Sequence, residues 1–308
     1  MKTKPKLNTI YIISKGRPQC RTAQTLTKMD YPGEWFIVCG TNDETIPQYQ
    51  AKWGKERILT FNWFEEVKQS DLLDNFGVES MSSGAVPVRN ATRRIARERG
   101  ELRHWQFDDD YSQFRHINSD LTKNITIKDG AFFERELLKI ATFAHEAKLA
   151  NAGFCLGMES FPEMVKTFSK RVFNAHNIPT DETLAMNWRG RMNDDLINAL
   201  EVYQHGKREM AFKFMTLMLA PTQSEKGGNT DIYELSGTVR KTAYAVLINP
   251  LAVKLQIKYG RYHHEVNWNA VSPKLLREVY AQWVPLRLSY RGGRTVRSGL
   301  CEGTNWRR

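Results

Sequence analysis

The sequence predicts an α/β protein in which a mostly parallel, Rossmann-like sheet is covered by helices. Short runs rich in Ile, Val and aromatic residues recur along the chain, and helical patterns lie between them. Gly, Pro and Asp mark several of the boundaries. Strands that alternate with helices favour a parallel sheet, because two parallel strands need a long crossover between them.

In the first half of the chain, the expected strands are short apolar runs at residues 9–14, 35–39, 58–61 and 105–107. A helix is expected over residues 21–29, which end at an Asp-Tyr-Pro-Gly turn signal. A second helix is expected over residues 88–99, because Pro87 occupies a position favoured at helix starts.

In the second half, the expected strands cover residues 154–158, 212–219 and 255–259. Helices are expected over residues 132–148, 194–203 and 230–246, where the apolar positions repeat with helical spacing. The Gly-Gly pairs at residues 227–228 and 292–293 indicate loops. We expect residues 1–250 to form the main domain and residues 251–308 a C-terminal extension of the same continuous unit.

Composition narrows the class of protein. The chain has 308 residues, of which 41% are apolar, enough for a sizeable core. Apolar runs stay well below the roughly 20 residues that span a bilayer, so we expect no membrane segment. The N-terminal apolar stretch is too short and mixed for a secretory signal. Reduced thiols in a cytoplasmic protein are expected for the four cysteines, Cys20, Cys39, Cys155 and Cys301.

The net charge of +11 calls for a partner or a structural explanation. One arginine cluster comprises Arg89, Arg93, Arg94, Arg97, Arg99 and Arg103. A second comprises Arg287, Arg291, Arg294, Arg297, Arg307 and Arg308, with Tyr290 and Trp306 among them. Basic patches with aromatic residues are typical of nucleic-acid binding, and an ordinary solvated surface is the alternative.

Three consecutive carboxylates, Asp108, Asp109 and Asp110, follow the expected strand at residues 105–107. Ligands of open α/β sheets bind at the carboxyl ends of strands. Adjacent carboxylates repel one another, and a hard cation such as Mg²⁺ or Mn²⁺ relieves that repulsion while binding phosphate. The motif therefore predicts a metal–phosphate site, with a simple polar turn as the alternative.

Two further motifs lie near this site in the expected topology. Arg89 and Asn90 open a helix, where they are suited to a diphosphate or a base, although a plain basic helix is the alternative. Residues 13–18 end the first strand in a flexible basic loop containing Ser14 and Arg17. Neither a Walker motif nor a Gly-x-Gly-x-x-Gly motif follows a strand.

A second acid pair, Asp194 and Asp195, begins an expected helix after Asn193. The helix dipole stabilises carboxylates there, so one of the two is a candidate general base. The alternative is that Asn193 or Asp194 only caps the helix. His263 and His264 are candidates to complete a metal shell, with a structural role as the alternative.

These motifs, taken in order, resemble a family. They are Ile-Tyr-Ile-Ile-Ser-Lys-Gly-Arg-Pro at residues 10–18, Val-Arg-Asn at residues 88–90, Phe-Asp-Asp-Asp at residues 107–110, and Asn-Asp-Asp at residues 193–195. Over residues 7–205 the chain resembles glycosyltransferases of the A type (GT-A). It is most similar to the TET-associated glycosyltransferases, which modify DNA bases in phages and eukaryotes.

The resemblance implies a GT-A-like fold and transfer of a sugar from a UDP-sugar to a 5-hydroxymethylpyrimidine in phage DNA, with 5-hydroxymethylcytosine as the expected base. It implies Mn²⁺ or Mg²⁺ held by Asp108, Asp110, His263 and His264. It places the nucleotide near Ser14, Arg17, Arg89, Asn90, Asp108 and Asp109. Asp194 or Asp195 occupies the position of the catalytic general base. The family's usual Glu-Asp is Asp-Asp here, so the resemblance does not decide which of the two is the general base. It also leaves open whether the configuration at the anomeric carbon is inverted or retained.

Two other functions remain open at this point. A GT-A enzyme acting on a protein, glycan or lipid would leave the basic patches incidental. A nucleic-acid-binding protein without catalysis would retain the acids without turnover. The sequence does not name the sugar or the oligomeric state. A host-cytoplasmic location is expected for a phage protein.

Overall fold

The computed structural model describes residues 5–75, 84–118, 120–156, 168–169, 171–219, 238–271, 287–289 and 295–297. The chain divides into two compact units, Met1–Ser272 and Pro273–Arg308. The second unit contains an antiparallel pair, β13 (Arg287–Ser289) and β14 (Thr295–Arg297). The boundary expected between a main domain of residues 1–250 and an extension of residues 251–308 stays a prediction. In the described residues, no helix is long and apolar enough to cross a membrane.

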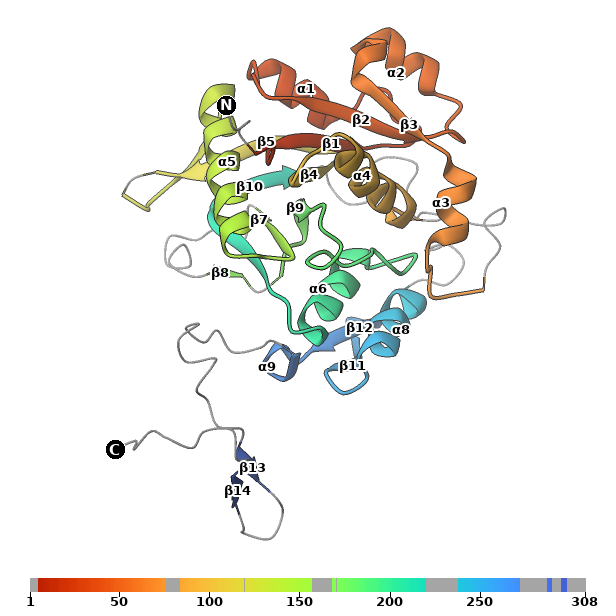
Figure 1. The fold of residues 1–308 in the computed structure, drawn as a ribbon, viewed down its shortest axis with the longest axis vertical. Coiled ribbons are helices and arrows are strands. Elements are labelled where there is room, and N and C mark those ends of the chain that lie inside the picture. The colour runs from red at the N-terminus through yellow and green to blue at the C-terminus, as the bar shows by residue number, and fades with distance from the viewer. Residues whose placement is uncertain are drawn as a thin grey trace. The chain divides into compact units, whose positions relative to one another are not determined.

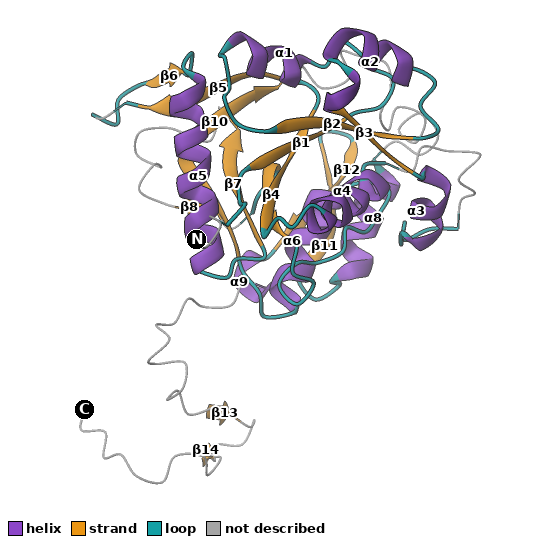
Figure 2. Ribbon diagram, turned by 45° about the horizontal axis from the view of Figure 1, so that its top comes forward, coloured by secondary structure: helices purple, strands orange, loops and turns teal. Residues whose placement is uncertain are grey.

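In the described ranges of the first unit, ten strands form one mixed sheet, which Figure 2 shows in orange. Its order is β3-β2-β1-β4-β9-β7-β10-β5-β6, and β8 pairs with β10. The strands are β1 (Thr9–Ile13), β2 (Trp35–Gly40), β3 (Ile58–Phe61), β4 (Arg103–Asp108), β5 (Tyr111–Ile117), β6 (Asn124–Thr126), β7 (Asn151–Leu156), β8 (Phe168–Ser169), β9 (Asn174–Pro179) and β10 (Glu209–Leu219).

The parallel half of the sheet matches the predicted pattern. β1 lies between β2 and β4 and runs parallel to both, and all five of its residues are buried. Such continuous burial is typical of parallel strands that are covered on both faces. The register places Ile13 opposite Asp108, so the loop after β1 and the acid motif after β4 share one edge of the sheet.

The other half departs from the expected parallel arrangement. β9 runs antiparallel to both β4 and β7, and β10 runs parallel to β7 but antiparallel to β5. β9 was not predicted, because its buried residues include His176 and Asn177 rather than a purely apolar run. The α/β class is therefore confirmed, with a mixed sheet in place of a mostly parallel one.

Helices cover both faces of the sheet (Figure 1). Because alternate residues of a strand face opposite ways, Ile10 and Ile12 pack with α1 (Arg21–Lys28), α2 (Ile46–Trp53) and α5 (Gly130–Glu146). Tyr11 faces the other side, where it joins a core cluster formed with α3 (Trp63–Gln69) and α4 (Val86–Glu98). The predicted helices at α1, α4 and α5 are confirmed within about two residues, whereas α2 and α3 were not expected.

The remaining elements of the first unit pack around α6 (Asp194–Gln204). They are α8 (Val239–Ile248), β11 (Val253–Lys258), β12 (Arg261–Val266) and α9 (Trp268–Val271). Leu196 and Leu200 of α6 form a core cluster with Ala245 and Val253. The beginning of the helix expected at residues 230–246 lies outside the described residues, as do Tyr290, Trp306 and the glycines at 227–228 and 292–293.

Candidate functional site

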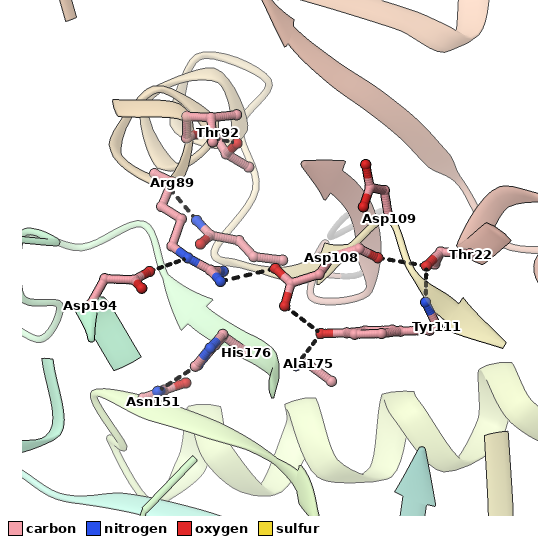
Figure 3. Close-up of polar contacts among 12 residues, drawn as sticks. Thr22, Arg89, Thr92, Asp108, Asp109, Tyr111, Asn151, Ala175, His176 and Asp194 are labelled. Atoms are coloured by element: carbon pink, nitrogen blue, oxygen red, sulfur yellow. Dashed lines mark hydrogen bonds and ion pairs between the residues drawn. The ribbon is translucent and has the colours of Figure 1, made fainter. Parts of the chain in front are cut away.

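The acid motif forms a tight turn at the carboxyl end of β4 (Figure 3). Thr22, at the start of α1, holds this turn from both sides. Its hydroxyl donates to the Asp108 carbonyl at 2.5 Å and accepts from the Tyr111 amide at 3.0 Å, while its own amide donates to the Asp109 carbonyl at 3.2 Å. The turn is therefore fixed before any ligand binds, as a preorganised site requires.

Asp109 is anchored within the protein. Ser14 donates to one carboxylate oxygen at 2.5 Å, and Arg17 donates to the other at 3.0 Å. The hydroxyl of Tyr49 contacts Ser14 at 2.6 Å and accepts from the Arg17 amide at 2.8 Å. Burial raises the pKa of Asp109, although Arg17 and Ser14 oppose the rise. The loop after β1, expected to be flexible, is thus held in place by these contacts.

Asp110 is the acid of the motif that fits a cation. Its Oδ1 is buried, and no group among the described residues hydrogen-bonds to it. Burial, followed by the charges of Asp108 and Asp109, raises the pKa of Asp110 to about 7. A hard divalent cation would both complete the coordination of this oxygen and offset the repulsion. The donor set of Asp110 and Asp108 therefore suits Mg²⁺ or Mn²⁺.

Arg89 joins the acid motif to the second acid pair. Its Nη2 donates to Asp108 at 2.9 Å, and its Nε donates to Asp194 at 2.8 Å, as Figure 3 shows. The guanidinium also lies over the Trp188 ring, 4.8 Å from its centroid. Burial disfavours its charge, but Asp108 and Asp194 outweigh that effect and raise the pKa of Arg89. One buried cation therefore fixes two carboxylates from distant parts of the chain.

Asn90 and its neighbours on α4 hold the segment that leads to the second acid pair. Asn90 exchanges two hydrogen bonds with the Trp188 backbone, at 2.9 and 3.1 Å. Arg93 donates to the Met186 carbonyl at 3.1 Å, and Arg97 pairs with Glu182. These α4 residues are spaced three and four apart, so they lie on one side of the helix. The nucleotide contacts expected for Arg89 and Asn90 stay a prediction.

Asp194 and Asp195 begin α6, but they lie in different surroundings. Asn193 occupies the N-cap position in a left-handed conformation, and within the described structure its side chain makes no capping bond. The simple capping role is therefore not what Asn193 does. Asp194 is bound to Arg89, whereas burial raises the pKa of Asp195 against the opposing charge of Arg171.

His263 and His264 face opposite sides of β12, because neighbouring strand residues alternate. The His264 Nδ1 lies 3.4 Å from the Asn193 side-chain nitrogen, and burial lowers the pKa of His264 to about 4. His263 is exposed. Across the described ranges, no three His, Cys, Asp or Glu side chains gather as a metal shell. The structure therefore places His264, not His263, beside the second acid pair.

A comparison with models of known protein families identifies the family of this chain. The model of the family described as TET-Associated Glycosyltransferase matches residues 8–228. The chain belongs to the TET-associated glycosyltransferases. No curated protein matches it. The match spans the acid turn, Arg89 and the second acid pair, so the protein is a glycosyltransferase, whose family implies a nucleotide-sugar donor and an acceptor.

The first arginine cluster of this glycosyltransferase is committed to partners within the chain. Arg94 pairs with Glu66 and Glu98, and Arg99 pairs with Glu34 and Glu101. Arg103 is buried and donates to Asn177 and to backbone carbonyls, and burial lowers its pKa to about 9. With Arg89, Arg93 and Arg97 bound as described, each arginine of the cluster has a partner within the first unit, and some of these pairs, such as Arg97 with Glu182, are exposed.

Sequence reasoning missed a buried polar group beneath the site. The side-chain nitrogen of Asn151 lies 3.0 Å from His176 and donates to Glu209 at 3.2 Å. Burial raises the pKa of Glu209 to about 8 and lowers the pKa of His176 well below its usual value. Tyr111 was also missed, although it directly follows the acid motif. Its hydroxyl donates to Asp108 at 3.3 Å and accepts from the Ala175 amide at 3.0 Å.

Proposed function

We propose that this glycosyltransferase moves a sugar from a UDP-sugar to the hydroxyl of a 5-hydroxymethylpyrimidine in DNA, with phage 5-hydroxymethylcytosine as the expected acceptor. The observation that carries the proposal is the Arg89 bridge, which joins acids on two sides of one site. Asp108 belongs to the acid turn and Asp194 to α6. A transferase needs both a donor side and an acceptor side within reach of each other.

On the donor side, Asp108 and Asp110 are the proposed ligands of Mn²⁺ or Mg²⁺. When bound, the metal ion offsets the negative charge that builds on the leaving diphosphate. Asp109 keeps the loop containing Ser14 and Arg17 against the acid turn, and this loop is the proposed nucleotide contact. The fixed turn holds the backbone of these two proposed metal ligands through the contacts of Thr22.

On the acceptor side, Asp195 is the proposed general base. Asp194 is held in an ion pair by Arg89, so its carboxylate already has a partner within the protein, whereas burial raises the pKa of Asp195. Asp195 takes the proton of the hydroxymethyl group as its oxygen attacks the anomeric carbon. The bond from that carbon to the diphosphate oxygen breaks, and the diphosphate leaves with the electron pair.

DNA is the proposed acceptor for two reasons. The net charge of +11 favours a polyanion, and the second arginine cluster belongs to the short Pro273–Arg308 unit. The family name also carries an association with TET, and the resemblance described above implies DNA bases as acceptors. A base in a duplex must leave the stack before its hydroxymethyl group reaches an enzyme site.

The test is a transfer assay on DNA containing 5-hydroxymethylcytosine or 5-hydroxymethyluracil, with Mn²⁺ and a panel of UDP-sugars. Mass spectrometry of the digested nucleosides should show the gain of one sugar, and Asp110→Ala should abolish it. UDP release without that gain would move the acceptor to a protein, glycan or lipid. If no donor yields either UDP release or a mass gain, the proposal is overturned.

A further inference from the structure

The hairpin of β11 and β12 ends in a turn that is unfavourable for the residues it contains. Lys258 pairs with Arg261, which leaves a two-residue loop of Tyr259 and Gly260. Both loop residues have positive φ, 52° and 70°, which is the signature of a type I′ turn. Such turns favour Asn-Gly, whereas a bulky aromatic residue at positive φ is strained. Tyr259 is nevertheless 97% exposed.

The two positively charged residues beside this turn also repel each other and destabilise the hairpin of the unbound protein. Lys258 and Arg261 lie directly opposite each other, and like charges at opposed positions destabilise a strand pair. Both side chains are exposed. Lys254 lies on the same face of β11, but Glu265 stands directly opposite it on β12, so the like-charge pair is the one at the turn. A polyanion would relieve the repulsion, and a stacked base would cover the Tyr259 ring. The turn therefore combines the two features that bind nucleic-acid strands.

The hairpin is also tied to the acceptor side of the site. Val253 and Val266, at its base, pack with Leu196 and Leu200 of α6. His264 of β12 contacts Asn193, which directly precedes the acid pair. Three residues separate His264 from Arg261, or about 10 Å at the usual rise of a strand. Figure 1 shows β11 and β12 beside α6 and α8.

We infer that the β11–β12 hairpin is a DNA-contacting element, in which Tyr259 stacks on a base next to the modified nucleotide while Lys258 and Arg261 bind the flanking phosphates. Aromatic wedges of this kind occupy or widen the space where a base leaves the stack. The inference rests on the proposed function, since it assigns the partner of the same site. It also adds a second contact to the one expected from the C-terminal arginines.

The central test is Tyr259→Asn, which replaces the aromatic ring by the residue that type I′ turns prefer. The turn should therefore form at least as well as in the wild type. Affinity for a hydroxymethylcytosine duplex, measured by fluorescence anisotropy, should fall by about 5- to 150-fold, the range for losing one stacked base. Tyr259→Trp should restore it, and UDP-sugar affinity should stay unchanged in both variants.

The contribution of Lys258 and Arg261 is tested separately, through the salt dependence of DNA affinity. Lys258→Gln and Arg261→Gln should each lower the slope of log affinity against log salt by about 1, as expected for one lost phosphate contact. Lys55→Gln is the matched control, because this exposed lysine follows α2, and α2 lies away from the hairpin in Figure 1 and Figure 2. Its affinity and salt slope should equal those of the wild type.

The outcomes separate the inference from the proposed function. Wild-type DNA binding with equal affinity in Tyr259→Asn would overturn the inference and leave the proposed function standing. Absence of DNA binding and transfer in the wild type would remove both. A change of oligomeric state in Tyr259→Asn, with DNA affinity intact, would assign the hairpin to contacts between copies of this chain and would also overturn the inference.

Discussion

At the scale of single residues, the acid turn separates roles that its sequence does not distinguish. Asp109 is anchored by Ser14 and Arg17, whereas Asp110 has a buried oxygen without a hydrogen bond in the described structure. Three adjacent aspartates predicted an anionic site at a strand end, and the structure supplies that placement. The division of roles depends on partners in the loop between β1 and α1, which lies about ninety residues earlier and could not be deduced from the motif.

Arg89 should act as a positioning residue rather than as a substrate contact. In Arg89→Lys the charge remains, but the ammonium cannot donate along two fixed directions to Asp108 and Asp194. We expect kcat to fall roughly 100-fold, as is typical when reacting groups shift slightly. Steady-state kinetics measure this. Arg94→Lys, which alters a more exposed pair with Glu66, should leave kcat unchanged.

The two α6 acids should differ when each is replaced. Asp195→Asn should lower kcat by about 100- to 10,000-fold, the usual contribution of a general base, with donor affinity preserved. Asp194→Asn should have the smaller effect, because Asp194 acts through Arg89. Equal losses in the two variants would contradict the assignment of Asp195.

The pH dependence of the wild type follows from the same assignment. A base must be ionised, and burial raises the pKa of Asp195 above its ordinary value. The rate should therefore fall as the pH drops through that raised pKa, earlier than for an ordinary aspartate. A rate that stays flat through this acidic range would exclude Asp195 as the group that limits it. Initial rates measured across the acidic range, at saturating donor, give the profile.

At the scale of elements, strands were predicted correctly where their buried residues form an apolar run. A strand was missed where its buried residues are polar and hydrogen-bond to other buried side chains. β1, β2 and β3 were predicted within one residue, because each is a short apolar segment of a covered parallel strand. β9 was missed because His176 and Asn177 carry no apolar periodicity. The cost of burying these two polar side chains is offset by hydrogen bonds with Asn151 of β7 and Arg103 of β4.

The buried polar group should make stability depend on pH. Glu209 has its pKa raised by burial to about 8, above the value of 4.5 expected in the unfolded chain. The folded state therefore keeps a proton that the unfolded state releases. Its contribution to stability is complete below about pH 4.5 and is lost as the pH rises toward 8, by about 1.4 kcal/mol per pH unit.

Glu209→Gln removes this titration, so the free energy of unfolding should fall less between pH 5 and 8 than in the wild type. Urea unfolding at several pH values measures the difference in slope. Glu182→Gln alters an exposed pair with Arg97 and serves as the control. Identical slopes in wild type and Glu209→Gln would show that Glu209 is ionised in the folded protein throughout this range.

At the scale of the whole molecule, positive charge is distributed unevenly. Residues 273–308 contain eight Lys and Arg and two Glu, a net of +6 out of the total of +11. The arginines of the first cluster pair with carboxylates and carbonyls of the first unit. Composition singled out both clusters, and a count of charges does not show which charges have partners within the chain.

Neutralising the C-terminal cluster should therefore weaken DNA binding specifically. In the full chain, Arg291→Gln, Arg294→Gln, Arg307→Gln and Arg308→Gln combined should lower duplex affinity and reduce the salt slope by up to about 4. UDP-sugar affinity, measured by calorimetry, should not change. DNA affinity equal to that of the wild type would restrict the acceptor contacts to the first unit.

The direction of β9 also limits how this chain can change in length. β9 ends at Pro179 opposite Arg103, the far end of β4 from Asp108, so residues 180–193 must return to the acid edge before α6 begins. Contacts from Arg97, Arg93 and Asn90 hold that return along α4. An insertion or deletion there would shift Asp194 and Asp195 along the site. Natural variation in length should therefore accumulate at turns such as residues 121–123, between β5 and β6, while the spacing from Pro179 to Asp194 stays constant among active relatives.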